Sequence, residues 1–589
     1  MSLQKEITTF RNDARKIWGK INEEMGNKKK SNSFGPMKVN GQSTTKADLI
    51  ANAFNKHYTS VATKLDEDLP RSNVDPLSFL RGNFPDSMVV PYVTPHDTSI
   101  IISSLKNKKS DINNIPVTLI KLVSQSLSTP LSNLFNQSLQ NGIFPDCLKH
   151  ANVIPLYKKG PKAEISNYRP ISLLSIFSKI LEKQMKIHLV KYLEQKSILS
   201  SHQFGFRNGL STFDALNSLS KDLFNALDNR MSAITVYIDF KSAFDTINHA
   251  ILLRKMEFYG IRGTVLDWFK SYLTDRTQSV TYQNNTSGRL YQTKGIPQGS
   301  VLGPVLFLIY IQDMAYIFNS LKCLLFADDS SLNIVGPNLL ELIYRTNAEL
   351  DKLYTWVLSN RLTINTSKTH YMITTNKSFN FLPPLFINFE IIKCVSHHKV
   401  LGVILDNKLK FHEHIKSISH KINSSIAMLN HIKNLVPNEL KRCLYFSHIQ
   451  SHLTYCMNIY GFTYPTHLMH LFKLQKKALR VITNSDYQAH SNPLFKNLNI
   501  LKHFDLVKLE AGTYAYKNKN SNEFLQLTHD YNTRFRADIV LPAHNLSIYQ
   551  NSLSYNSIKI WNSIERNIKI KSTVKSFRSN YRKFLMSSY

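Results

Sequence analysis

The sequence predicts an α+β protein, and two kinds of pattern support this. In the middle of the chain, Ala233–Phe240 alternates apolar and polar residues with period two, and Leu324–Ile334 resembles two short strands around a turn. After residue 410 the apolar spacing changes to three and four, which is typical of an amphipathic helix. The residues of this helical pattern are Ile415, Ile418, Ile422, Ile426 and Leu429. A chain with strands in its centre and helices after them is expected to be α+β.

The segment Leu324–Ser331 has two adjacent carboxylates at the tip of an apolar strand. We expect a strand, a two-residue turn and a second strand, with Asp328 and Asp329 lifted together because Asp tolerates a left-handed turn. Two neighbouring like charges repel each other unless a cation or ligand lies between them. Alone, however, an acidic dipeptide in an exposed turn is usually only solvated.

Asp239 ends the other predicted strand, on the opposite face from Ile234, Val236 and Ile238. One interpretation is an N-cap, since Lys241–Ile247 has helical spacing. The alternative is a third carboxylate that meets Asp328 and Asp329 if the two strands are neighbours. Such a group could bind two Mg²⁺ ions that activate a hydroxyl and stabilise a leaving phosphate.

Between these acids lies Gly295–Pro304, a loop rich in Gly and Pro that leads into a helix predicted at Val305–Met314. Its glycines would let another chain approach the backbone, and the following helix N-terminus could receive an anion or a stacked base pair. A tight loop without a ligand is the alternative.

These segments, in this order, resemble motifs A, B and C of reverse transcriptases, close to the jockey group of non-LTR (LINE-type) retrotransposons. The three motifs are Tyr237–Asp245, Gly295–Ser300 and Phe326–Asp329. Further matches are Asn167–Ser172, Gln203–Arg207, Leu362–Asn365 with Lys368 and Thr369, and Val400–Asp406. The resemblance is strong over 152–406 and less specific over much of the remainder. It implies an RNA-directed DNA polymerase that extends a DNA primer with dNTPs on an RNA template.

The resemblance also implies a right-hand polymerase fold, with fingers, a palm built on an antiparallel sheet with flanking helices, and a helical thumb. We expect a helical N-terminal extension at 1–110, fingers and palm at 111–405, the thumb at 406–485 and a basic helical C-terminal region at 486–589.

For the chemistry, the resemblance implies that Asp239 and Asp328 are ligands of both metal ions, Mg²⁺ with Mn²⁺ as a substitute, while Asp329 supports the site less directly. Lys368 could protonate the leaving pyrophosphate, or be merely an exposed lysine. The nucleotide-binding set comprises Lys158, Arg169, Phe240, Phe244, Gln298 and Gly299. Within it, Arg169 would bind the triphosphate unless it forms a surface ion pair instead.

Phe244 matches the aromatic residue that lies under the sugar and excludes a 2′-hydroxyl, so it should select deoxynucleotides. It also belongs to a helical stripe with Phe240, Ile247 and Ile251, so a core role is compatible. Gln298 would contact the nucleotide through its amide. Leu401 and Gly402 match the hairpin that holds the primer end.

A basic helical face is predicted beyond the palm, around Leu468–Ile482. Its outer residues, expected to hold the template–primer duplex by its phosphates, are Lys473, Lys476, Lys477 and Arg480. An ordinary solvated face is the alternative. Near the C-terminus, basic residues alternate with aromatics such as Tyr549 and Trp561, and this region could bind RNA by stacking and charge.

Composition independently indicates a nucleic-acid partner. The chain has a net charge of +32 and a pI of about 9.7, and 42% hydrophobic residues predict a globular protein. Five cysteines without a Cys-x-x-Cys pattern indicate reduced thiols. With no export signal and no apolar run long enough to span a bilayer, we expect an intracellular protein of the nucleus or cytoplasm.

The region before the fingers is expected to be mostly helical, with a basic break at Lys28–Ser33. It is too short for an endonuclease, so target nicking would need a separately encoded one. Two alternatives to an active enzyme of this group remain open. One is a domesticated or decayed relic that binds RNA or DNA without catalysis, and the other is a reverse transcriptase of the group II intron type.

Overall fold

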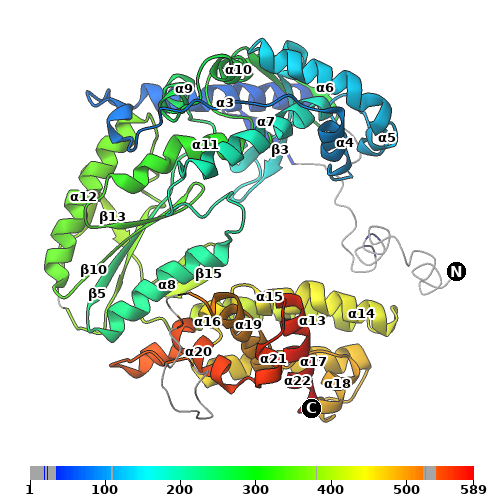
Figure 1. Cartoon of the computed structure of the whole chain (residues 1–589), viewed down its shortest axis with the longest axis vertical. Helices are drawn as coiled ribbons and strands as arrows, with labels where there is room; N and C mark the ends of the chain where they lie inside the picture. Colours follow the sequence, from blue (N-terminus) through cyan, green and yellow to red (C-terminus); the bar gives the residue numbers. More distant parts are fainter. Residues whose placement is uncertain are drawn as a thin grey trace.

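The computed structural model describes residues 35–107, 111–379, 381–521 and 539–589, together with residues 19, 23 and 524. Helices and sheets are mixed along the chain, as predicted. In Figure 1 the elements form a C, with a helix-rich upper body, a sheet along one side and a lower helical body that carries the C-terminus. The predicted break at Lys28–Ser33 lies outside the described residues.

The sheet at the side has six strands in the order β12-β13-β11-β5-β10-β9. Their bounds are β5 Ser232–Ile238, β9 Lys322–Phe326, β10 Asp329–Gly336, β11 His370–Thr374, β12 Leu385–Ile387 and β13 Glu390–Cys394. All neighbours are antiparallel except β11 and β13. The predicted strands around Asp239 and the acidic pair are therefore sheet neighbours, as the convergence of the three acids requires.

One face of this sheet is covered by helices of the upper body. Ile234, Val236 and Ile238 of β5 belong to a core shared with these helices, whereas Tyr237 belongs to a second core on the other face. Helix α12, Leu339–Ser359, contacts β5 and β10 directly, and the same core continues into α7 Ile176–Gln195, α9 His249–Phe258, α10 Thr264–Leu273 and α11 Gly303–Ile311. The alternation predicted for β5 is confirmed, and Asp239 follows Ile238 on the side away from the covering helices.

A second sheet lies in the upper body, with strand order β4-β3-β6-β7, and with β8 also paired to β6. The bounds are β3 His150–Tyr157, β4 Tyr168–Leu173, β6 Arg276–Tyr282, β7 Asn285–Thr286 and β8 Leu290–Gln292. Helix α3, Ala47–Glu67, packs its Phe54 and Ile50 against Val153 and Tyr168 of this sheet. The other helices here are α4 Pro95–Ser103, α5 Val117–Leu122 and α6 Ser124–Gln140.

The lower helical body contains the predicted amphipathic helices. Its helices are α13 His412–Ile432, α14 Asn438–Tyr445, α15 Ser451–Thr454, α16 Met457–Tyr460, α17 Pro465–Thr483, α18 Ser491–Asn497, α19 His503–Asn518, α20 Leu553–Ser563, α21 Arg566–Lys569 and α22 Val574–Ser587. The predicted inner residues Leu468, Leu471, Leu474 and Leu479 are buried. Helix α8, Thr212–Asp228, lies between this body and the sheet and shares the same core.

Three local predictions were wrong. Residues 241–246 form turns instead of a helix, and Ser242 has a left-handed φ of 47°. Met37–Val39 and Gln42–Thr44, in a region expected to be helical, form a β-hairpin. Tyr549 and Trp561 are buried in the core of the lower body, so these rings are closed to stacking with RNA bases.

All five cysteines are free thiols, as predicted. Among the described residues, no helix combines the length and apolar character that crossing a membrane would require.

Candidate active site

Asp239 follows the last residue of β5 and is fixed by a segment about 125 residues later in the chain. The amide of Asn365 donates to the Asp239 carbonyl at 2.7 Å, and the Asp239 amide donates to Thr369 Oγ1 at 3.3 Å. The ammonium of Lys368 lies 3.7 Å from Asp239 Oδ2. The segment 365–369 therefore supports Asp239 and brings Lys368 to it.

The acidic hairpin, formed by β9, the turn and β10, brings Asp328 and Asp329 to the same place. Ser330 pairs with Ile238, so the next pair in this antiparallel register sets Asp329 across from Asp239. The turn differs from the prediction because Ala327 and Asp328 form it, and Asp329 already pairs with Phe326 as the first residue of β10. Ala327, not an Asp, adopts the left-handed φ of 57°.

The Ala327–Asp328 turn is supported by contacts with the Gln203–Gly205 segment. This segment pairs with β9 at the edge of the sheet. The Phe204 amide donates to Leu325 O at 2.8 Å, and the Leu325 amide donates to His202 O at 2.9 Å. Gln203 Oε1 accepts from the amides of Gly205 at 2.8 Å and Ala327 at 3.2 Å. The sequence identified this motif by resemblance, but its supporting role follows only from these contacts.

Gly205→Ala is expected to lower catalysis at least about tenfold, because small misplacements of reacting groups are costly. A Cβ at residue 205 would lie 2.4 Å from the Ala327 amide nitrogen and push the turn out of position. Single-nucleotide incorporation rates would measure the effect. Gly288→Ala is the control, since a Cβ there meets nothing within 4 Å; equal rates for both variants would contradict the supporting role.

Burial and mutual repulsion govern the acids of the hairpin. Desolvation by the surrounding protein is the main cause that raises the pKa of both Asp328 and Asp329, although both residues are partly open to solvent. The charge of Asp239 further raises the pKa of Asp328, and the charges of Asp328 and Asp239 further raise the pKa of Asp329. All three carboxylates thus lie close enough to repel one another.

The donor set suits a hard divalent cation, because carboxylate oxygens crowded by like charge gain from one. Within the described residues, no group of three or more His, Cys, Asp or Glu side chains is arranged to bind a metal ion. Mg²⁺ usually takes only one or two protein carboxylates and completes its shell with water and substrate phosphates. The acids therefore fit Mg²⁺ bound together with a nucleotide better than a closed protein site.

Cationic side chains surround the acids. Lys158 follows β3, and Arg169 lies in β4, which pairs with β3. Burial lowers the pKa of Lys158, and the charges of Arg169 and Lys368 lower it further, so the three cations lie within reach of one another. The charges of Arg169 and Lys158 also act on both hairpin acids. The structure thus brings together the predicted phosphate-binding residues and the predicted metal ligands.

The Gly295–Ser300 loop is joined to the segment after Asp239. The amide of Ile296 donates to Phe244 O at 2.9 Å, and the amide of Ser172 in β4 donates to Gln298 O at 2.8 Å. Gly299 is required for this second contact, because a Cβ would lie 2.7 Å from Ser172 O. The loop therefore links β4, which carries Arg169, with the segment that carries Phe244.

Phe244 is half-buried and stacks on Phe307 of α11, with ring centroids 4.5 Å apart. Phe240 is buried and forms a β-bridge with Ile364. The amide of Gln298, expected to contact the nucleotide, donates instead to Asp245 Oδ1 at 2.9 Å and Oδ2 at 3.1 Å. Asp245 was missed by sequence reasoning; its only signal was a second acid inside the first motif.

Asp245 is expected to make stability depend on pH. Burial raises its pKa to about 6, against the opposing hydrogen bond from Gln298. The folded state therefore binds this proton more tightly than the unfolded state, and stability should fall by at most about 3 kcal/mol as pH rises from about 4 through 6. Urea unfolding at pH 4 and 8 would measure this. In Asp245→Asn that part of the decrease should vanish; an unchanged decrease would contradict the assignment.

Leu401 and Gly402 form the tight turn between β14, His397–Val400, and β15, Val403–Asp406, with φ values of 46° and 89°. Tyr455, which sequence reasoning missed, donates from its hydroxyl to Leu401 O at 2.6 Å. A Cβ on Gly402 would lie 3.0 Å from the Tyr455 ring, so the turn is pressed against the lower body.

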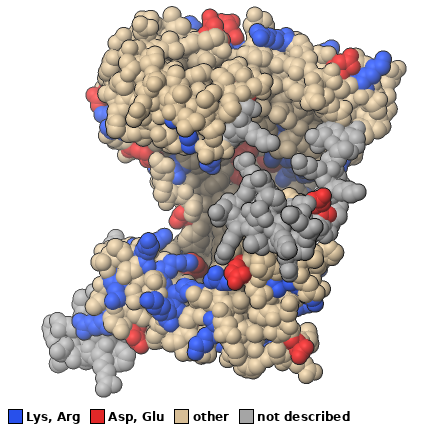
Figure 2. Space-filling model, turned by 90° about the vertical axis from the view of Figure 1, so that its right-hand side faces the viewer, with Lys and Arg blue, Asp and Glu red and all other residues tan. Residues whose placement is uncertain are grey.

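The predicted basic face of α17 is only partly free. Lys473 and Lys477 are exposed, and Lys476 lies over the Phe472 ring at 4.9 Å. Arg480 donates to Ala489 O at 2.9 and 3.1 Å, which restrains its guanidinium. Figure 2 shows Lys and Arg gathered on the lower body and a hollow between it and the upper body.

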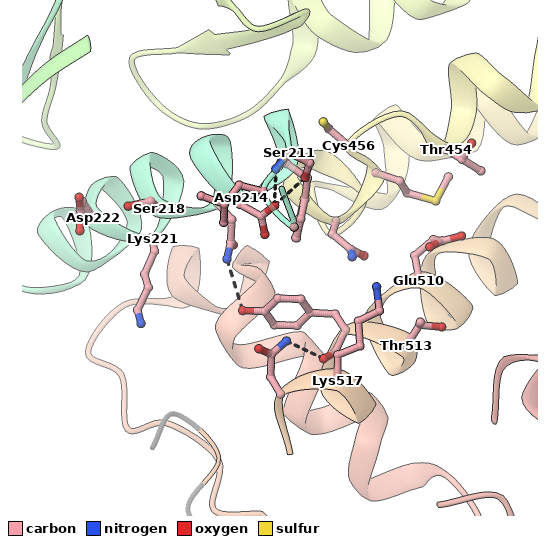
Figure 3. A pocket seen from close by; sticks show the side chains of 18 of the residues that line it. Ser211, Asp214, Ser218, Lys221, Asp222, Thr454, Cys456, Glu510, Thr513 and Lys517 are labelled. Carbon is pink, nitrogen blue, oxygen red and sulfur yellow. Dashed lines mark hydrogen bonds between the residues drawn. The ribbon is translucent and has the colours of Figure 1, made fainter. Parts of the chain in front are cut away.

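A pocket of about 990 Å³ lies elsewhere, between α8 and the helices α16 and α19 (Figure 3). The Nδ2 amide of Asn217 in α8 donates to the Tyr514 hydroxyl of α19 at 3.3 Å. Its lining contains none of the predicted site residues. The site at the acidic hairpin is therefore identified by its chemistry and not by cavity size.

Comparison with known proteins gives a consistent result. Residues 157–404 match the family model for reverse transcriptase (RNA-dependent DNA polymerase). The chain is 28% identical over 469 residues to the probable RNA-directed DNA polymerase from transposon BS of Drosophila melanogaster, covering 76% of this chain and 51% of that protein.

Two further relatives are the RNA-directed DNA polymerases from mobile element jockey. The Drosophila funebris protein is 28% identical, covering 73% of this chain and 48% of its own length, and the Drosophila melanogaster protein is 26% identical, covering 80% and 52%. The chain spans about half the length of the curated relatives it matches. The matched residues 157–404 include Asp239, which follows β5, and the acidic hairpin, so this part of the chain is similar to reverse transcriptases, and the longer alignments are to polymerases of non-LTR transposons.

Proposed function

We propose that the protein is an RNA-directed DNA polymerase of a non-LTR retrotransposon, which extends a DNA primer with dNTPs on an RNA template. The main supporting observation is that Asp239 faces the acidic hairpin, with Lys158, Arg169 and Lys368 close to these acids. Opposed carboxylates beside a group of cations suit a metal-bound triphosphate. A protein that only bound nucleic acid would gain nothing from acids that repel phosphate.

On this proposal, the C-shaped arrangement corresponds to a right hand. The upper body with β3, β4 and β6 would be the fingers, the six-stranded sheet the palm, and the lower helical body from residue 406 the thumb and C-terminal region. The hollow between the bodies would hold the template–primer duplex, with Lys473, Lys476, Lys477 and Arg480 of α17 contributing positive charge. The Leu401–Gly402 turn would support the primer end.

Asp239 and Asp328 would hold Mg²⁺, or Mn²⁺ in its place, with Asp329 in a less direct role. The bound metal would supply charge stabilisation at the reacting phosphate and lower the pKa of the primer hydroxyl. Arg169 and Lys158 would bind the triphosphate oxygens, since their cationic side chains are already gathered at the acids. Lys368, 3.7 Å from Asp239, is suitably located to donate a proton to pyrophosphate.

Phe244 would exclude ribonucleotides by crowding the 2′ position. Its ring is backed by Phe307 and its carbonyl is tied to Ile296, so it is restrained on two sides. Phe240, Gln298 and Gly299 would shape the same pocket, Gln298 through its bond to Asp245 instead of a direct amide contact. In this arrangement, local rigidity supports sugar selection.

Primer extension on an RNA template with a DNA primer, dNTPs and Mg²⁺ tests the proposal. Wild-type protein should extend the primer, while Asp328→Asn should not, and chelation with EDTA should stop the reaction. Both proteins should bind the duplex in a salt-dependent manner, because binding depends mainly on the basic residues. If wild-type protein binds the duplex but extends no more than Asp328→Asn, the protein is a binding relic and the proposal fails.

A further inference from the structure

We propose that Asp66, at the end of α3, is a positioning residue that holds the nucleotide site together from outside the reverse transcriptase match. This inference rests on the proposed polymerase function and assigns it a further residue. Helix α3 ends at Glu67, about 90 residues before the matched region begins at residue 157.

The Asp66 carboxylate binds two cations that come from different parts of the site. Lys294 forms an ion pair with Asp66 Oδ2, and Arg361 Nε donates to Asp66 Oδ1 at 2.5 Å. The Arg361 guanidinium also donates to the Asp66 carbonyl and to Pro70 O, the latter at 2.9 Å. The side chains of the three residues are 20–24% exposed, so solvent screens these bonds only partly.

Lys294 and Arg361 each lie at the start of a segment that supports a residue of the proposed active site. Lys294 leads into the Gly295–Ser300 loop, where the Gly295 amide donates to Ile247 O at 2.8 Å and Ile296 holds Phe244. The first residue of this loop packs tightly against the segment after Asp239, because a Cβ at Gly295 would lie 2.4 Å from Asp245 O.

Arg361 begins the second segment, with a left-handed φ of 51°. Two residues later, Thr363 O accepts from the Lys241 amide at 2.8 Å, and Asn365 then binds Asp239. The same segment ends in Lys368. Asp66 is therefore joined to the supports of both Phe244 and Asp239.

The location of Asp66 is itself unfavourable for the helix. A carboxylate in the last turn meets the negative end of the helix dipole, and α3 already has the more favourable Lys64 there. Although burial opposes ionisation, the bonds from Lys294 and Arg361 hold the pKa of Asp66 below its usual value. Asp66 is therefore unfavourable for its own helix, and its charge is balanced by cations from distant parts of the chain. Such a conflict with local preference indicates that Asp66 is needed for the site.

The rest of α3 fixes the position of Asp66. Asn55 Nδ2 donates to Gly288 O at 2.8 Å, and Gln278 Nε2 donates to Asn55 Oδ1 at 3.0 Å. Phe54 packs edge-on against Tyr168, the residue before Arg169, with centroids 5.2 Å apart. The helix is thus anchored on the sheet that carries Arg169, and Asp66 extends from this anchor to the loop and the palm.

The test compares Asp66→Asn with Glu67→Gln, an exposed neighbour in the same helix, and with the conservative Asp66→Glu. For single-nucleotide incorporation we expect Asp66→Asn to lower kcat/KM for dNTP about tenfold and to reduce the preference for dNTP over rNTP severalfold. Glu67→Gln should match the wild type, and Asp66→Glu should recover part of the loss. A loss of activity with unchanged sugar preference would indicate general destabilisation and overturn the inference.

Hydrogen–deuterium exchange gives a readout that needs no activity. In Asp66→Asn, amides of residues 294–299 and 361–369 should exchange faster than in wild type, while those of β6 stay unchanged. If neither segment changes, the inference is wrong whatever the activity. If both change but wild type does not extend a primer, the proposed function fails while the link from α3 to these segments stands.

Discussion

Asp239→Asn is expected to lower RNA-templated primer extension by about 10³-fold or more, the largest effect on activity that we predict. The amide removes the carboxylate that faces the acidic hairpin, and with it the charge that would attract the metal ion to Asp328. The backbone bonds of Asp239 to Asn365 and Thr369 do not involve its side chain, so the local structure should persist.

Single-turnover incorporation of one dNTP would measure this, with Asp351→Asn on the exposed face of α12 as a control. Asp329→Asn should reduce the rate less than Asp239→Asn, since we propose that Asp239 binds the metal ion and that Asp329 has a less direct role. The melting temperature should change little, because the lost ion pair with Lys368 is solvent-exposed and weak, and one of three repelling charges is removed. Extension by Asp239→Asn within about tenfold of wild type would be incompatible with catalysis by these acids.

Lys255→Met is expected to destabilise the fold by about 3–5 kcal/mol, the largest effect on stability. Lys255 and Asp313 form an ion pair at 2.8 Å with both side chains fully buried. Burial lowers the pKa of Lys255, and Asp313 opposes this shift. Without the ammonium, Asp313 keeps the bond from Trp356 Nε1 at 3.0 Å but loses the cation that compensates its buried charge.

The free energy of unfolding in urea would show this loss. Arg345→Met is the matched control, because its pair with Glu341 spans 3.5 Å on an exposed helix surface and should contribute less than about 1 kcal/mol. The double variant Lys255→Met, Asp313→Leu should recover much of the stability, since it leaves no unpaired charge. A loss below about 1 kcal/mol for Lys255→Met alone would show that the pair is not essential.

Periodicity predicted the central strands and the helices after residue 410 because their buried faces follow the spacing of each element. It failed after Asp239, although Phe240, Phe244, Ile247 and Ile251 have helical spacing. There, the Lys241 amide donates to Thr363 O and Phe240 forms a β-bridge with Ile364. These backbone groups pair with a distant segment and are not available for a helix. Helix α9 starts only at His249.

The order of the motifs predicted the residues of the candidate site, but it did not predict the residues that hold them in position. Gln203 holds the Ala327 turn across 124 residues, and Asp66 reaches Arg361 across 295. No local pattern specifies such partners. The same limit explains the C-terminal aromatics, since Trp561 alternates with basic residues in the sequence yet packs into the core of the lower body.

The most direct test of the central claim is the sequence of the product made on an RNA template of defined sequence with a DNA primer, dNTPs and Mg²⁺. The wild-type protein should make DNA complementary to the RNA, and Asp239→Asn should make none. Failure of the wild type to extend the primer, or addition of nucleotides unrelated to the template, would contradict the claim.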